Sequence, residues 1–117
     1  MIAPISGVRV WLWPHPVDFR KGHDGLAALV QTGLGRDPFN GDVFVFRSRR
    51  ADRVKIVAWH DGGLCLLYKR LEDGGFRWPL IRAGAMTLSG AQLAMLLAGL
   101  DWSKGQRQPA WRPAAAC

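Results

Sequence analysis

Five short segments are rich in β-branched and aromatic residues, several in alternation with polar ones, which is typical of β-strands. Residues 8–13 read VRVWLW before a proline, and residues 43–47 read VFVFR, too apolar to be half exposed. Residues 53–59 alternate between an apolar face and a more polar one. Residues 64–71 follow the glycine-rich turn His-Asp-Gly-Gly, which favours a hairpin. A second glycine-rich turn leads into residues 76–78, and a proline ends them. The pattern predicts about five strands, mainly in an antiparallel meander.

A helical spacing follows the first strand. Asp18 is expected to cap a helix that begins near Phe19, and two glycines, Gly33 and Gly35, are expected to end it. The apolar stripe that would face the core consists of Phe19, His23, Leu26, Ala27, Val30 and Leu34.

A second helix is predicted near the end of the domain. The sequence Ser-Gly-Ala-Gln at residues 89–92 has the form of a capping box, in which the serine and glutamine side chains bond to each other's backbone N–H groups. Residues 83–100 are uncharged and long enough to span a bilayer. Their serine, threonine, glutamine and glycines favour a capped amphipathic helix over a membrane span.

These elements predict one α+β domain over residues 1–102, with a mainly antiparallel sheet and two helices. The chain has 117 residues, of which 49% are hydrophobic, and this suits a single compact domain with its own core. Residues 103–117 contain two prolines and show no apolar periodicity, so we expect a flexible basic tail.

The charge of the chain is strongly positive and unevenly distributed. Lys and Arg number 16 against 9 Asp and Glu, a formal net charge of +7. The excess comes from residues 47–55 (RSRRADRVK) and from the last sixteen residues, where no acidic residue occurs. Most of these basic residues are arginines, whose planar guanidinium binds phosphate oxygens in pairs and stacks on bases. The composition indicates a nucleic-acid partner, with a membrane surface or an acidic protein as alternatives.

Two sets of residues are therefore candidates for binding. The candidate nucleic-acid-binding residues are Arg47, Arg49, Arg50, Arg53, Lys55, Lys104, Arg107 and Arg112. A solvated hairpin tip is the alternative interpretation of the first five. Six tryptophans exceed what so small a core needs, so Trp59, Trp102 and Trp111 are candidates for a protein interface.

Catalytic chemistry is not indicated. Most acidic residues fall at predicted caps and turns, which leaves Asp24 and Asp52, and a two-metal site needs several converging carboxylates. The two cysteines, Cys65 and Cys117, form neither a disulfide framework nor a metal-ligand spacing, which fits a reducing, cytoplasmic setting. We expect a protein that is not an enzyme and that uses no metal or cofactor.

The order of the motifs resembles a known family. The segments that carry the resemblance are GVRVWL (7–12), DFRKGHDGLAALV (18–30), RDPFNGDVFVFRSRRADRVKIVAW (36–59), GLCLLYKRLEDGGFRWP (63–79) and LSGAQLAMLLAGLDW (88–102). They are similar to the TnpB accessory proteins of the insertion-sequence sixty-six group of bacterial transposable elements, which are distinct from the RNA-guided nucleases of the same name.

This resemblance implies a role in transposition beside a separate transposase encoded by the same element. Together with the charge, it predicts a non-catalytic accessory protein that binds DNA with little sequence preference through residues 47–55. The alternative is a protein-interaction module that recruits or regulates the transposase without binding DNA.

Overall fold

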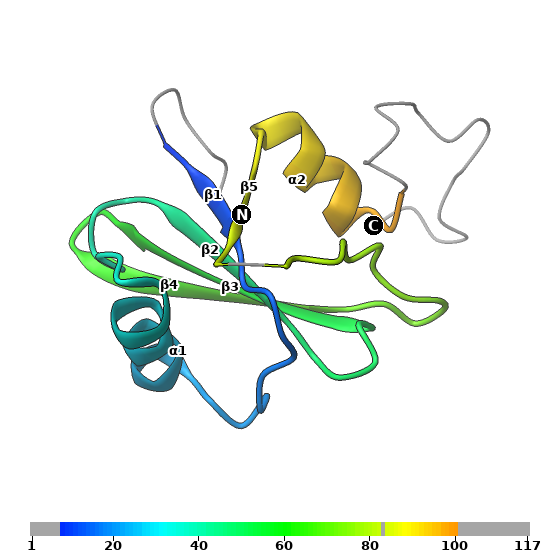
Figure 1. The fold of residues 1–117 in the computed structure, drawn as a ribbon, viewed down its shortest axis with the longest axis horizontal. Helices are drawn as coiled ribbons and strands as arrows, with labels where there is room; N and C mark the ends of the chain where they lie inside the picture. Colours follow the sequence, from blue (N-terminus) through cyan, green and yellow to red (C-terminus); the bar gives the residue numbers. More distant parts are fainter. Residues whose placement is uncertain (1–7, 83, 101–117) are drawn as a thin grey trace.

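A five-stranded sheet lies between two helices, α1 below it and α2 above it in the view of Figure 1. The computed structural model describes residues 8–82 and 84–100. Its elements in chain order are β1 (Val10–Leu12), α1 (His23–Leu29), the π-helical turn η1 (Val30–Leu34), β2 (Val43–Arg47), β3 (Arg53–His60), β4 (Gly63–Arg70), β5 (Met86–Leu88) and α2 (Gly90–Leu97). The predicted α+β class is confirmed, and the predicted tail lies outside the described residues.

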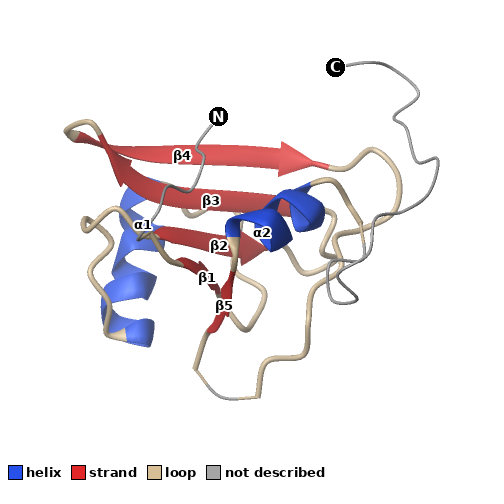
Figure 2. Cartoon of the chain, turned by 90° about the horizontal axis from the view of Figure 1, so that it is seen from above, coloured by secondary structure: helices blue, strands red, loops and turns tan. Residues whose placement is uncertain are grey.

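The strands follow the order β4-β3-β2-β1-β5, so β4 and β5 form the two edges of the sheet (Figure 2). β1 and β2 are parallel and are joined through α1, whereas all other neighbours are antiparallel. Of the meander predicted around the two glycine-rich turns, the first hairpin is present as β3–β4, and β2 in place of residues 76–78 is its third strand. The β3–β4 turn places Asp61 (φ 53°) and Gly62 (φ 80°) in the left-handed region. A two-residue hairpin turn needs this conformation if its twist is to match that of the flanking strands.

Alternation along the strands builds two cores, one on each face of the sheet. On the face toward α2, Val10, Leu12, Val45 and Ile56 are among the buried residues, and they pack with Leu96 of the helix. Residues of opposite parity, which include Trp11, Phe44 and Phe46, pack on the other face with Leu26 and Val30 from the α1 side. Burial on both faces explains why β2 is a continuous apolar run.

The first helix begins later than predicted. Asp18 caps no helix, because its carboxylate accepts bonds from the backbone N–H and the guanidinium of Arg20. The helix starts at His23, and the residue at its N-cap, Gly22, has no side chain that could cap it. Gly35 (φ 62°) ends the helical stretch as predicted, whereas Gly33 lies inside it.

Residues 76–78 do not form the predicted strand, and the fifth strand is β5. Phe76 is buried, and its N–H donates to Ala51 O at 2.6 Å. The N–H of Trp78 then bonds back to Phe76 O, while its indole Nε1 donates to Trp13 O. The alternating side chains of this segment therefore serve contacts across the end of the sheet rather than a strand ladder.

The predicted capping box is confirmed. Ser89 accepts from the backbone N–H of Gln92, and the Gln92 side chain accepts from that of Ser89. The eight-residue helix that follows buries Leu93, Leu96 and Leu97. Among the described residues, no helix is long and apolar enough to cross a membrane.

Gly33 is needed for packing, which gives a test of the fold. A Cβ at this position would overlap the ring of Trp13, whereas a Cβ at Gly22 would meet open space. Gly33→Ala should lower the free energy of unfolding by about 1–3 kcal/mol, because the ring must shift within a packed layer. Gly22→Ala is the control, and urea unfolding of both variants measures the difference. Equal stabilities would show that Trp13 moves aside freely.

Candidate nucleic-acid interface

The loop between β2 and β3, residues 48–52, carries the centre of the basic segment and is held by its own hydrogen bonds. The N–H of Ser48 donates to Arg53 O, and the N–H of Ala51 donates to Ser48 O. The Ser48 hydroxyl donates to Asp52 Oδ1 and accepts from the N–H of Arg53. Ala51 has a φ of 58°, an uncommon conformation for a residue with a side chain, and one that closes this tight turn.

A second segment fixes the same loop from outside. The N–H groups of Phe76 and Leu71 donate to Ala51 O and Asp52 O at 2.6 and 2.8 Å. The chain approaches so closely that a Cβ at Gly75 would lie 3.2 Å from Ala51 O. Because the loop backbone is bonded on both sides, its side chains project from a fixed support.

Three arginines project from this loop and the start of β3 and have no acidic partner in the described part of the chain. Arg49, Arg50 and Arg53 are exposed, and none of them forms an ion pair with a carboxylate of the described residues. Other arginines do have acidic partners: Arg70 donates to Glu72 at 2.9 Å, and this bond raises the pKa of its guanidinium.

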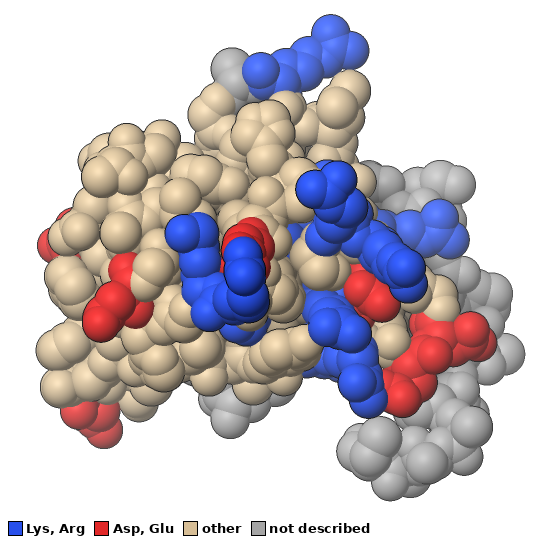
Figure 3. All heavy atoms as spheres, turned by 90° about the horizontal axis from the view of Figure 1, so that it is seen from below, with Lys and Arg blue, Asp and Glu red and all other residues tan. Residues whose placement is uncertain are grey.

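The charge is visibly uneven on the surface. In Figure 3 the Lys and Arg side chains occupy the centre and right of the face, with some Asp and Glu among them. The left end, where the β3–β4 turn lies in Figure 1, carries acidic side chains but no basic ones. The basic side chains therefore gather toward the end of the molecule that holds the 48–52 loop.

Arg47 points away from Arg53 because of strand parity. It pairs with Val54, whose side chain lies in the core on the α2 face. Its guanidinium donates to the carbonyl oxygens of Ser48 and Arg49 at 3.3 and 3.2 Å. Arg47 thus contributes to holding the loop.

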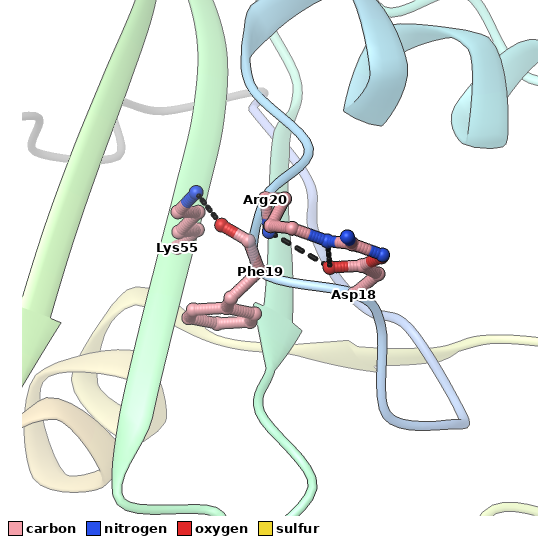
Figure 4. A network of polar contacts seen from close by, with 4 residues as sticks. All are labelled: Asp18, Phe19, Arg20 and Lys55. Carbon is pink, nitrogen blue, oxygen red and sulfur yellow. Dashed lines mark hydrogen bonds and ion pairs between the residues drawn. The ribbon is translucent and has the colours of Figure 1, made fainter.

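Lys55 is buried, although the sequence groups it with the surface arginines. Its exposed fraction is 6%, and its Nζ donates to Phe19 O at 2.7 Å (Figure 4) and also to Lys21 O at 2.8 Å. The ammonium also lies 5.1 Å from the centre of the Phe19 ring and 5.4 Å from that of Tyr68. These contacts hold the ammonium in the interior, so Lys55 is not available to a phosphate at the surface.

Asp18 and Arg20 form an exposed ion pair next to this buried lysine. The guanidinium and backbone N–H of Arg20 hold the pKa of the Asp18 carboxyl well below its usual range. The Arg20 side chain is almost fully in solvent and that of Asp18 is nearly half exposed, so the pair contributes little stability. Its main effect is to occupy the guanidinium of Arg20 with an acidic partner.

A shallow hollow of about 360 Å³ opens beside the loop. It is lined by Phe19, Ser48, Arg49, Arg50, Asp52 and Arg53. Three guanidinium groups against one carboxylate leave the hollow positively charged. Phe19 is not among the candidates predicted from the sequence. The sequence analysis places it in the core-facing stripe of a helix, whereas the structure starts that helix later and leaves Phe19 beside the hollow.

The remaining candidates lie elsewhere. Trp59 is 37% exposed near the far end of β3, where its ring meets Phe39 edge to face at 5.7 Å. Trp102, Trp111, Lys104, Arg107 and Arg112 lie outside the described residues. Asp52 bonds to Ser48, Asp24 is exposed on α1, and the described residues contain no group of three His, Cys, Asp or Glu placed to hold a metal.

Comparison with known proteins gives one family and two relatives. A family model described as IS66 Orf2 like protein matches residues 8–107. The uncharacterized protein y4jC of Sinorhizobium fredii (strain NBRC 101917 / NGR234) is 44% identical over 113 residues, which are 97% of each chain. The uncharacterized protein y4hO of the same strain is 43% identical over 114 residues, 97% of this chain and 96% of the relative. No solved structure matches the chain significantly.

Buried Lys55 should contribute more to the free energy of unfolding than an exposed lysine does. Lys55→Met should lower the free energy of unfolding by about 2 kcal/mol, because two carbonyl oxygens lose a charged donor. The control is Lys69→Met, since exposed Lys69 makes one such bond, to Leu97 O at 2.7 Å. Its loss should cost less than about 1 kcal/mol. Denaturant midpoints compare the two, and an equal effect would contradict the structural role assigned to Lys55.

Proposed function

Because the chain belongs to the IS66 Orf2-like family, accessory proteins of IS66 insertion-sequence elements, we propose that it serves transposition as a non-catalytic DNA-binding protein. The family membership confirms the resemblance seen in the sequence. In the proposed role the 48–52 loop and the first residue of β3 bind DNA phosphates, and the bound protein assists the separate transposase of the same element.

The observation that carries this proposal is the set of three arginines without acidic partners on a fixed loop. Arg49, Arg50 and Arg53 project from a backbone bonded on both sides, so little backbone conformational entropy is lost when they bind. Guanidinium groups in this state are suited to phosphate oxygens, which they bind in pairs. Release of counterions from DNA then makes the affinity depend steeply on salt.

The helices argue for low sequence preference. Base edges in the major groove are read mainly by Arg, Lys, Asn and Gln side chains on an inserted helix. α1 reads HDGLAAL and α2 reads GAQLAMLL, and each uses its apolar residues against the sheet. Neither helix presents a row of such side chains, so the proposed contacts are with the sugar-phosphate backbone.

A second candidate function is supported by a different surface. Phe39 and Trp59 are 45% and 37% exposed and contact each other at the end of the molecule opposite the arginines. Exposed aromatic pairs are common anchors of protein interfaces. This pair suits a contact with another protein such as the transposase, with or without DNA binding.

The arginine proposal is tested by a charge-matched comparison. Replacing Arg49, Arg50 and Arg53 together by Gln should weaken binding to random-sequence duplex DNA at least tenfold, and should reduce the slope of log affinity against log salt by about 3. The same change at Arg9, Arg36 and Arg82, which are also exposed, is the control and should have a much smaller effect.

Fluorescence anisotropy at several salt concentrations measures both variants, with circular dichroism to check the fold. Equal losses in the two variants would mean that only total charge matters. Wild-type binding that is absent at low salt, or insensitive to salt, would reject DNA binding and favour the Phe39–Trp59 surface.

A further inference from the structure

We propose that the site beside the 48–52 loop takes unpaired DNA, with a base stacked on the face of Tyr68 beside Phe19 and the neighbouring phosphates on the arginines. This inference rests on the proposed DNA binding and adds which form of DNA the site prefers. It concerns two aromatic residues that the charge pattern of the sequence does not single out.

Tyr68 and Phe19 form an aromatic pair at the surface of the sheet. Tyr68 lies on the edge strand β4 and is 48% exposed, at the point where the half-buried residues of the strand give way to exposed ones. Phe19 meets it edge to face, with ring centres 5.8 Å apart and an angle of 84°. Such a contact leaves ring surface open to a third aromatic group.

The pair is held from beneath by Lys55. Its ammonium lies 5.1 and 5.4 Å from the two ring centres and bonds to the carbonyl oxygens of Phe19 and Lys21. Figure 4 shows the bond to Phe19. Those bonds fix the backbone of Phe19 against β3, and the cation-π contacts favour one placement of each ring. The rings are therefore oriented before any ligand arrives, which lowers the entropy lost on binding.

The aromatic pair adjoins the arginines directly. Phe19 lines the same hollow as Arg49, Arg50 and Arg53. Lys55 and Tyr68 are register partners on β3 and β4, and Arg53 lies two residues before Lys55 on the same face. An aromatic surface for a base and cations for its phosphates thus occur within one small area, which is the combination found in sites for single-stranded nucleic acid.

Base pairing decides whether these rings can take part. In a duplex the faces of the bases are covered by their neighbours, so a ring on a protein surface has nothing to stack on. An unpaired strand or a frayed end exposes those faces, and stacking on aromatic rings then adds to the phosphate contacts with little dependence on sequence. The binding of duplex DNA is stabilised only by the phosphate contacts.

The protein contains a matched aromatic pair as a control. Phe39 and Trp59 have the same edge-to-face arrangement at 5.7 Å, and Trp59, at 37%, is nearly as exposed as Tyr68, at 48%. Trp59 is six residues from Arg53 along β3, roughly 20 Å away at about 3.3 Å per residue. If exposed aromatic rings bound DNA regardless of their surroundings, both pairs would contribute.

The experiment uses the full chain and one DNA sequence in two forms, a 15-nucleotide single strand without self-complementarity and its blunt duplex. Tyr68→Ala should weaken binding of the single strand about tenfold and that of the duplex less than twofold. Tyr68→Phe should retain wild-type affinity for both, since stacking does not require the hydroxyl. Trp59→Ala should leave both affinities unchanged.

The outcomes separate this inference from the proposed function. Equal weakening of both DNA forms by Tyr68→Ala, or a loss for the single strand caused equally by Trp59→Ala, would overturn the stacking site while leaving the arginine site intact. If the loop arginine variant also binds both forms like the wild type, DNA binding through this loop fails as well. Unfolding midpoints of each variant exclude a loss of fold as the cause.

Discussion

The buried ammonium of Lys55 is the constraint on which the surrounding structure depends. A charged group that is removed from water must find partners inside the protein, because the cost of leaving it unpaired is several kcal/mol. Lys55 obtains these partners from residues 19–21, in the connection from β1 to α1. The connection is thereby held against β3, with a turn closed by the bond from the N–H of Lys21 to Asp18 O, and the helix begins only at His23. The same bonds set the ring of Phe19 beside Tyr68.

The 48–52 loop shows a complementary principle. Three guanidinium groups without acidic partners repel one another, and a free loop would separate them. Here bonds from Leu71 and Phe76, together with the Ser48 network, hold the backbone in place despite that repulsion. A polyanion would relieve the repulsion, so the unneutralised charge is a cost in the free protein that favours a bound state. Local conflict of this kind is commonly found at functional sites.

The sequence predicts what depends on near neighbours. The two-residue turn at Asp61 and Gly62, the capping box at Ser89 and the alternation along β3 all follow from residues a few positions apart, and the structure contains each of them. These features give the sheet meander and α2, and with them the α+β class.

What the sequence does not predict depends on contacts between distant segments. The alternation at residues 76–78 looks like a strand, yet Phe76 is held by Ala51 and Trp78 by Trp13. Lys55 looks like a surface lysine, because nothing in its neighbourhood indicates that carbonyl oxygens more than thirty residues earlier receive its charge. The start of α1 and the exposed ring pair follow from that unforeseen bond. The arginines of the loop were identifiable by charge alone, but their separation from Arg47 required the strand register.

The surface proposed to bind DNA is one area, formed by the 48–52 loop with Phe19 and Tyr68. The most direct test is a titration of the isotope-labelled protein with single-stranded DNA, followed through the backbone amide signals by NMR. We expect the largest shifts at residues 48–53 and around residues 19 and 68, while the amides near Phe39 and Trp59 change little. Shifts concentrated near Phe39 and Trp59, or spread evenly over the basic surface, would contradict the proposed binding surface.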